Sequence, residues 1–451
     1  MTSEELATPA PWKPLVHGHS ATRIGALLAT IARDLAPLDR NPAGRIVPGS
    51  RIIAAEIALF FSYFDAFAPD QGHDAAALWW LGEAMSRETR EGSVALHEGL
   101  TFVAWVAAHL EGRLFDAAGD DPNADFDPLI LELLEHERWA GEYELFRGLT
   151  GLGVYFLERW PRPSAARGLG LIIDHLAKLA EEMPGKLGSP VGYAWFTAPE
   201  RLPQWQRELT PRGHYNLGTA HGLPGVLVVL AAAIALDVRT ELASELLTGA
   251  ATWMLEQKLP PGEKSVFPTW VPKDGEPPAS RFGWCYGEAG IASTLLCAAR
   301  ATGQQEWSRE ALELGRSVAA RSPDPELIDE PGLCHGAAGL ATLLARLHFF
   351  SAGEQGTEEL ARGARVWANA ALDLCDPEVD GAGGFWSLRS GDGPRVDPTF
   401  LRGAVGVGLA LLSLVSDVHP QWHRLLTLSA PPIDGPFVRF LTEDRPAEDN
   451  P

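Results

Sequence analysis

A four-residue pattern with glycine at its first and fourth positions recurs along the chain, and each copy is followed by an apolar run. The copies are Gly148–Gly151, Gly222–Gly225, Gly287–Gly290, Gly336–Gly339 and Gly403–Gly406, with a weaker copy at Gly99–Phe102. Their first glycines lie 49 to 74 residues apart, which leaves room for two helices and their connections. Helical hairpins repeated at such a period are typical of closed or stacked helical arrays. The sequence therefore predicts an all-α fold built as such an array.

The glycines need a physical reason, because each costs about 1 kcal/mol relative to alanine inside a helix. Glycines three positions apart lie on one helical face and let backbones approach closely. If every copy begins an inner helix, the helix starts converge on one crowded surface. We expect that surface to carry the functional site.

Two of the four cysteines stand two residues before these glycines, Cys285 in Trp284–Gly287 and Cys334 beside His335 in Cys334–Gly336. Two thiolates and an imidazole suit zinc, and three protein ligands rather than four indicate a catalytic metal with an open position. Adjacent residues point about 100° apart on a regular helix, so Cys334 and His335 can face one metal only in a turn or at a helix start. The alternative is that both cysteines are buried small hydrophobic residues.

Three motifs in order resemble the signatures of one family, the lanthionine synthetase C-like (lanthipeptide cyclase) family. They are Asn216–Gly222 with its Ala-His-Gly end, Trp284–Gly287 and Cys334–Gly336. The similarity in repeat layout runs from about Leu96 to Val415. The resemblance implies an α/α toroid of about seven helical hairpins, with zinc at the mouth of the inner barrel. It also implies an enzyme that adds peptide cysteines to dehydroalanine or dehydrobutyrine and so closes thioether rings.

Carried over by position, the resemblance assigns the zinc ligands to Cys285, Cys334 and His335, and the active-site histidine to His221. It further assigns Arg281, four residues before the first zinc cysteine, to an arginine near the metal, and Tyr286 to the tyrosine that follows that cysteine. One position departs from the pattern. The family has aspartate four residues before the glycine of the second repeat, and this chain has Glu144 there.

The chemistry of ring closure agrees with these roles. A free cysteine thiol is mostly protonated at neutral pH, and zinc coordination deprotonates it. Attack on a dehydro residue leaves an enolate that must be protonated, for which His221 is the expected donor and Glu144 its orienting partner. Arg281 is expected to stabilise the negative charge of the enolate.

Each of these residues also has a structural interpretation. His221 could cap a helix or pack in the core, and His214 is the nearest rival histidine, which we treat as a lining or structural residue. Arg281 could form a surface ion pair, and Tyr286 could pack with its hydroxyl bonded to backbone. Glu144 could belong to an acidic helix face.

The composition sets limits on partners and location. The 37 basic and 59 acidic side chains give a net charge of −22, which disfavours nucleic acid and anionic membranes as partners. The longest uninterrupted apolar run, Val226 to Leu236, is too short to span a bilayer. No secretory signal is recognised at the N-terminus, and ligands that must stay reduced indicate a cytoplasmic protein.

We expect one domain over residues 1–451, with loose tails at about 1–20 and 443–451. Three function classes remain open. The first is a zinc-dependent cyclase acting on a precursor peptide that a separate dehydratase has dehydrated. The second is another zinc-dependent thiol-transfer enzyme, for example one that adds glutathione, and the third is a non-catalytic peptide-binding scaffold that contains zinc.

Overall fold

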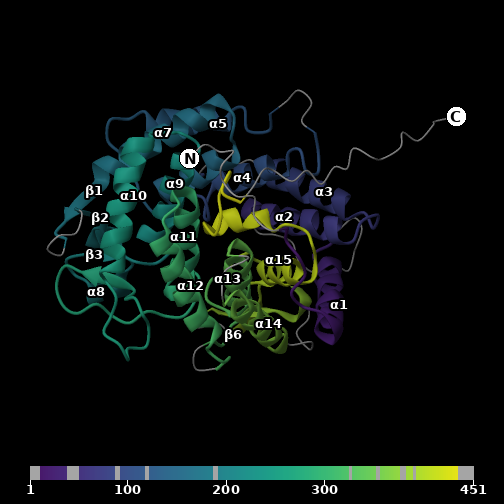
Figure 1. Cartoon of the computed structure of the whole chain (residues 1–451). Coiled ribbons are helices and arrows are strands. Elements are labelled where there is room, and N and C mark those ends of the chain that lie inside the picture. Colours follow the sequence, from purple (N-terminus) through teal and green to yellow (C-terminus); the bar gives the residue numbers. More distant parts are fainter. Residues whose placement is uncertain are drawn as a thin grey trace.

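The structure is a computed structural model that describes residues 11–37, 50–86, 92–116, 121–185, 191–324, 328–351, 356–375, 382–389 and 393–434. Helices dominate it, as the sequence predicts, and they form an inner and an outer layer (Figure 1). The C-terminal tail expected at 443–451 lies outside the described residues. No helix within these ranges is long and apolar enough to cross a membrane.

The inner layer is a closed ring in which each helix contacts the next and α15 contacts α2. Its members are α2 (Arg51–Phe67), α4 (Leu100–Leu110), α6 (Leu149–Glu158), α9 (Leu223–Ala235), α11 (Glu288–Thr302), α13 (Ala337–Phe350) and α15 (Ala404–Val415). These helices are mostly apolar and are buried on nearly every side; all residues of α6 are buried, for example. A helix that is hydrophobic all round requires neighbours on every face, and the ring supplies them together with the outer layer.

The outer layer consists of helices that lie outside the inner ring, and most of them pack against an inner helix. It contains α1 (Gly18–Asp34), α3 (His73–Ser86), α5 (Phe126–Leu134), α7 (Pro163–Leu179), α10 (Thr240–Leu255), α12 (Gln305–Ala319) and α14 (Thr357–Asp373). Most outer helices directly follow an inner helix in the chain. The exception is the pair of α15 and α1, in which the inner helix comes last in the chain and the outer helix comes first. The last pair is therefore not a contiguous hairpin, and the count of about seven hairpins stays a prediction.

The glycines of the repeat allow the turn before each inner helix to fold back against the helix start. The first glycine directly precedes α4, α6, α9, α11, α13 and α15. A Cβ on either glycine of a full copy would lie closer than 3.0 Å to the carbonyl oxygen six residues earlier, as at Gly148 with Glu142 and at Gly406 with Phe400. The repeat glycines thus allow each helix start to lie close to the turn that directly precedes it in the chain.

Two small sheets depart from the all-α prediction. The larger is antiparallel with strand order β1 (Ala180–Met183), β2 (Gly192–Thr197), β3 (His214–Asn216) and β4 (Trp270–Pro272). It lies beside α10, with the short helices η1 (Pro199–Arg201) and α8 (Gln204–Leu209) between β2 and β3. The second sheet pairs β5 (Trp386–Arg389) with β6 (Gly393–Val396), after the short helix η2 (Ala382–Gly384). Strands of three to six residues give little periodic signal, so the sequence did not reveal them.

Segments from both ends of the chain complete the core. The 3-10 helix η3 (Gln421–Leu426) is buried inside the ring, where the backbone N–H of Trp422 donates to Tyr63 and the Trp284 indole donates to the Leu426 carbonyl. Residues 11–20 fall within the expected N-terminal tail, yet they pack against α15. The Trp12 indole donates to the Ser413 carbonyl at 2.7 Å and is 4% exposed.

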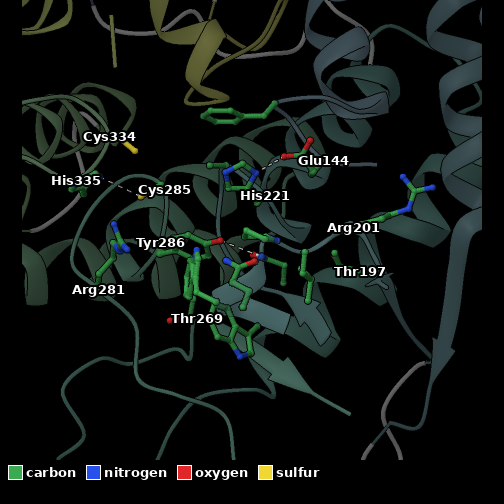
Figure 2. Close-up of a pocket in the computed structure, with 18 of the residues that line it drawn as sticks. Glu144, Thr197, Arg201, His221, Thr269, Arg281, Cys285, Tyr286, Cys334 and His335 are labelled. Atoms are coloured by element: carbon green, nitrogen blue, oxygen red, sulfur yellow. Dashed lines mark hydrogen bonds and ion pairs between the residues drawn. The ribbon is translucent and has the colours of Figure 1, made fainter. Parts of the chain in front are cut away.

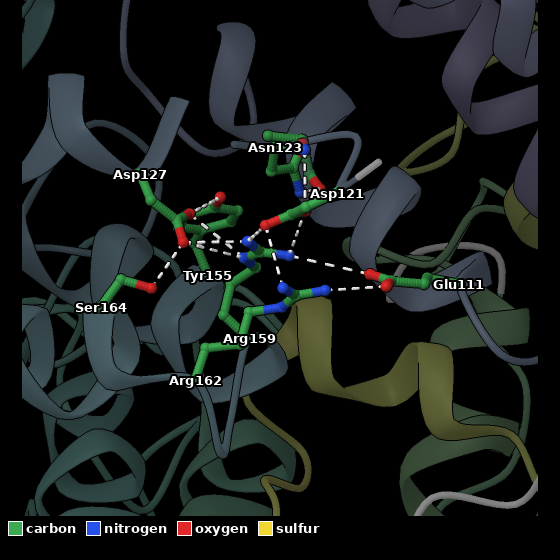
Figure 3. A network of polar contacts seen from close by, with 9 residues as sticks. Glu111, Asp121, Asn123, Asp127, Tyr155, Arg159, Arg162 and Ser164 are labelled. Carbon is green, nitrogen blue, oxygen red and sulfur yellow. Dashed lines mark hydrogen bonds and ion pairs between the residues drawn. The ribbon is translucent and has the colours of Figure 1, made fainter. Parts of the chain in front are cut away.

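A buried ion network fixes the end of α6 that lies away from its glycine turn (Figure 3). The Arg159 guanidinium, 1% exposed, binds both oxygens of Asp127 on α5 and the carboxylate of Asp121 before it. Asp127 also accepts from the hydroxyls of Tyr155 and Ser164. Because each buried charge is met by opposite charge and hydrogen bonds, the network connects α5, α6 and α7 without leaving an uncompensated ion.

The glycine contacts predict unequal effects of two alanine substitutions. Gly406→Ala, whose Cβ would collide with the Phe400 carbonyl, should lower the free energy of unfolding by about 1–3 kcal/mol. Gly82 lies in the middle of α3, and a Cβ added there would meet no neighbouring atom within 4 Å. Gly82→Ala should therefore raise the free energy of unfolding by about 0.5–1 kcal/mol. Denaturant unfolding of both variants measures the difference; equal stability would contradict the explanation of the repeat.

Candidate active site

The turns before the inner helices surround a pocket of about 910 Å³. Many of its lining residues are among the two that directly precede a repeat glycine: Glu98, Phe146, Arg147, Ala220, His221, Cys285, Tyr286, Cys334, His335, Leu401 and Arg402. Glu144 and Arg281 line it too. The convergence of helix starts predicted from the repeat is thus observed, and it gathers every candidate residue of the sequence analysis in one cavity.

Backbone hydrogen bonds join neighbouring turns at one repeated position, two residues before the first glycine. The N–H of Cys285 donates to the Cys334 carbonyl at 3.1 Å, and the N–H of Cys334 donates to the Leu401 carbonyl at 2.9 Å. Ala220 donates in the same way to Cys285 at 3.4 Å, and His97 to Phe146 at 3.2 Å. This bonding places the two cysteines side by side although 48 residues separate them in the chain.

Cys285, Cys334 and His335 form a group whose ligand atoms all lie within 4.8 Å of one another. Cys285 Sγ lies 3.9 Å from His335 Nδ1. Ligands of a tetrahedral zinc are about 3.5–3.8 Å apart, as zinc–ligand bonds of about 2.0–2.3 Å require. The sulfur and nitrogen donors and their spacing therefore fit zinc. Cys334 and His335 both lie in the turn before α13, where a shared target is geometrically possible.

The three groups change one another's protonation. A hydrogen bond from the Cys334 thiol, followed by one from His335, holds the pKa of Cys285 well below its usual value in spite of burial. The hydrogen bond to Cys285 and burial raise the pKa of Cys334. Hydrogen bonds to Cys285 and Glu330 raise the pKa of His335 to about 9. Cys285 is therefore the thiolate of this group, and zinc binding would release the protons of Cys334 and His335.

A carboxylate on the far side of the imidazole fixes the orientation of His335. Glu330 Oε2 lies 3.3 Å from His335 Nε2, and Glu330 Oε1 accepts from Arg402 at 2.7 Å. With Nε2 held in this way, Nδ1 is the nitrogen that faces Cys285. Metal-binding histidines commonly have such a carboxylate partner, which sets the tautomer and the ring orientation.

His221 and Glu144 form a second group on the opposite side of the pocket (Figure 2). His221 Nδ1 lies 2.6 Å from Glu144 Oε2, and Glu144 Oε1 accepts from the Arg147 backbone N–H at 2.7 Å. Glu144 is 6% exposed and lies in the turn before α6, so it does not belong to an acidic helix face. The Phe146 ring packs on the imidazole at 4.5 Å between centroids. The His221 side chain remains 42% exposed toward the pocket.

Tyr286 lies between His221 and Arg281 in the pocket (Figure 2). The Tyr286 ring centroid is 6.5 Å from that of His221 and 6.0 Å from the Arg281 guanidinium carbon. Burial raises the pKa of Tyr286 to about 12, so its hydroxyl is neutral at physiological pH. Its partner is the side chain of Asn216 at 3.2 Å rather than backbone. Arg281 is exposed, and no ion pair is found for it within the described ranges.

His214 lies outside the pocket lining. It is fully buried on β3, stacks on Trp270 at 4.8 Å between centroids, and bonds to the Thr210 hydroxyl at 3.0 Å. Burial lowers its pKa to about 4. These contacts support a structural place for His214 and leave His221 as the histidine that faces the pocket.

Sequence reasoning missed the polar residues that support the site. Asn216 and Glu330 each stand six residues before the first glycine of a copy, as Arg281 does. The backbone carbonyl at this position accepts from the first helical N–H in several copies, for example Glu330 from Ala337 at 3.0 Å. Alignment of the copies on their glycines would have marked this position as a second one that faces the site.

Comparison with known proteins agrees with this geometry. The family model of lanthionine synthetase C-like proteins matches residues 54–427. The chain belongs to this family. Among curated proteins it is 27% identical, over 216 residues, to the nisin biosynthesis protein NisC of Lactococcus lactis subsp. lactis; this match covers 44% of the present chain and 47% of NisC. The chain thus spans about half the length of this curated relative.

Solved structures extend the likeness to the fold. A structure of nisin cyclase superposes with a TM-score of 0.63 at 21% sequence identity, covering 83% of this chain and 90% of that chain. The lanthionine synthetase C-like family member described here therefore shares the helical ring of that enzyme.

The ligand group predicts how zinc binding responds to mutation. Cys334→Ala removes one of two sulfur donors, so the purified protein should lose most of its zinc, measured by elemental analysis. Cys375→Ala is the matched control, because this half-buried cysteine lies at the end of α14 away from the pocket. Full zinc occupancy in Cys334→Ala would refute the ligand assignment.

Proposed function

We propose that the protein is a zinc-dependent lanthipeptide cyclase. It would add cysteine thiols of a dehydrated precursor peptide to dehydroalanine or dehydrobutyrine residues of the same peptide, closing lanthionine and methyllanthionine rings. The observation that carries the proposal is that a Cys₂His group and a carboxylate-bound histidine open into one pocket. Membership of the family and the likeness to NisC and nisin cyclase support it.

The shape of the pocket supports a peptide as the substrate. Its volume of about 910 Å³ is at the upper end of the range for small-molecule sites. Trp205 and Leu209, one turn apart on α8, line it and expose 52% and 64% of their surface. Exposed apolar side chains at a pocket are typical of a surface that a partner covers. The substrate must arrive with its dehydro residues formed, which implies a separate dehydratase.

Cys285, Cys334 and His335 would hold the zinc. When bound, it would supply the positive charge that keeps a substrate thiol ionised near neutral pH. Glu330 and Arg402 would keep His335 turned toward the two cysteines. The remaining side chains of the pocket would act on the dehydro residue.

The reaction forms one C–S bond and one C–H bond. As sulfur attacks the β-carbon, the C=C electron pair moves toward the α-carbon and its carbonyl oxygen, giving an enolate. His221 would then deliver a proton from Nε2 to the α-carbon, while Glu144 holds Nδ1 and balances the positive charge of the protonated ring. Arg281 and Tyr286 would donate hydrogen bonds to the enolate oxygen. The thiol proton replaces the one that His221 gives up, so atoms balance without another reactant.

A thiol-counting assay tests the function, because ring closure does not change the mass of the peptide. A dehydrated peptide with one cysteine is incubated with the protein and then alkylated. The proposal expects loss of the alkylation adduct in the presence of zinc and its retention after chelation. A peptide that keeps its free thiol but gains glutathione when glutathione is supplied would favour the thiol-transfer alternative. Binding without either change would favour a scaffold.

His221 should be far more sensitive to substitution than His214. His221→Asn removes the proton donor that faces the pocket and should reduce ring closure by about 10²–10⁴-fold with zinc content unchanged. His214→Asn should cost much less, because His214 does not line the pocket and can act on the substrate only through Asn216. Rates from the thiol assay compare the two variants. Equal losses, or a larger loss for His214→Asn, would show that the catalytic role is assigned to the wrong histidine.

Glu144 should act through its charge as well as through its hydrogen bond. Glu144→Gln keeps the length of the side chain but cannot balance a protonated His221, so ring closure should fall by about tenfold or more. Glu144→Asp keeps the carboxylate and restores the family residue, and it should retain more activity than Glu144→Gln. Glu142→Gln is the matched control, since Glu142 lines the same pocket but pairs with Arg201. A rate for Glu144→Gln within about a factor of two of the parent would leave Glu144 a structural role only.

A further inference from the structure

A chain of buried polar groups runs from α8 to the hydroxyl of Tyr286. Its members are Gln206, Thr210, His214, Asn216 and Tyr286, each 9% exposed or less. The Thr210 hydroxyl bonds to the Gln206 carbonyl and to His214 Nδ1, both at 3.0 Å. Asn216 Nδ2 reaches His214 Nε2 at 3.5 Å and Tyr286 Oη at 3.2 Å. Gln206, Asn216 and Tyr286 line the pocket, whereas Thr210 and His214 do not.

The direction of every hydrogen bond in this chain follows from one backbone group. The Gly218 N–H, whose hydrogen position is fixed by the backbone, donates to Asn216 Oδ1 at 2.8 Å. The amide oxygen is therefore used there, and Nδ2 with its two hydrogens must face His214 and Tyr286. His214 Nε2 is then an acceptor, so Nδ1 carries the hydrogen and donates to Thr210. The Thr210 hydroxyl in turn donates to the Gln206 carbonyl.

The assignment leaves one donor unused. Tyr286 Oη accepts from Asn216, so its own hydrogen points away from Asn216. In the part of the chain that the structure describes, no acceptor for that hydrogen is found. The Tyr286 ring lies between His221 and Arg281 in the lining of the pocket (Figure 2), where a substrate carbonyl could accept from its hydroxyl.

We propose that Asn216 is a positioning residue that forces Tyr286 to donate its hydrogen bond into the pocket, onto the carbonyl oxygen of the dehydro residue. Gly218 and His214 hold the Asn216 amide in the required orientation. When sulfur adds to the β-carbon and the electron pair shifts toward that oxygen, the preset donor meets the developing charge without reorienting. Tyr286 keeps its proton throughout. This inference rests on the proposed cyclase function.

Asn216→Asp changes the direction of hydrogen bonding in this series of polar groups with almost no change in the shape of the side chain. One carboxylate oxygen still accepts from the Gly218 N–H, but the other replaces the amide nitrogen and can only accept. The Tyr286 hydrogen then turns to the carboxylate and is lost to the substrate. We expect kcat for ring closure to fall by about tenfold to a hundredfold, with KM and zinc content close to those of the parent.

A double-mutant cycle separates this effect from that of a new charge near the pocket. Tyr286→Phe should lower kcat by a similar factor, and the Asn216→Asp/Tyr286→Phe protein should be no slower than the slower single variant. A carboxylate that acts only through its charge would instead multiply the loss caused by Tyr286→Phe. Multiplying losses, or an unchanged rate in Asn216→Asp, would overturn the inference.

Asn216→Ala adds an independent comparison. Alanine removes the constraint and lets Tyr286 rotate, so part of its donation is kept, and Asn216→Ala should be faster than Asn216→Asp. A merely structural asparagine predicts the opposite order, because aspartate keeps more contacts. Thermal unfolding confirms that the variants compared are folded. Absence of ring closure by the parent protein would count against the cyclase function itself, whereas the outcomes above concern only Asn216.

Discussion

Backbone hydrogen bonds between successive turns at the mouth of the helical ring determine where every functional side chain lies. Each bond runs between residues at the same repeat position, from His97 to Phe146, Ala220 to Cys285, Cys285 to Cys334 and Cys334 to Leu401. The turns can meet in this way because the repeat glycines let each turn fold against its own helix start. A side chain on either glycine would push the turn outward and separate the positions that now meet.

This arrangement explains how the Cys285–Cys334–His335 group and the His221–Glu144 pair come to share a pocket. Cys285 and Cys334 occupy the same position in neighbouring copies, so the backbone bond between them brings two sulfur atoms together. His221 and His335 occupy the next position, one facing Glu144 and the other facing Glu330. The two imidazoles thus have different carboxylate partners. Tyr286 at the corresponding position in a third copy lies between them.

The sequence predicted the parts of the structure that depend on repeated local chemistry. The glycine copies indicated inner helix starts and their convergence, and the Cys285, Cys334 and His335 motifs indicated one metal site, because each depends on residues adjacent in the chain. The sheet at β1–β4 and the buried segment η3 gave no such signal, since strands of three to six residues have little periodicity and η3 is stabilised by contacts with distant residues such as Tyr63 and Trp284. The bond between Glu144 and His221 was expected from family resemblance, but Asn216 and Glu330 were not, because their roles follow from side-chain orientation.

X-ray absorption at the zinc edge of the purified parent protein tests the central claim most directly, since it reports the atoms that the converging turns bring to one metal. The account predicts one zinc with two sulfur ligands at about 2.3 Å and at least one nitrogen ligand at about 2.0–2.1 Å. A coordination shell of oxygen and nitrogen alone, or one with four sulfur atoms, would contradict it, because Cys285, Cys334 and His335 could then not be the set that holds the metal.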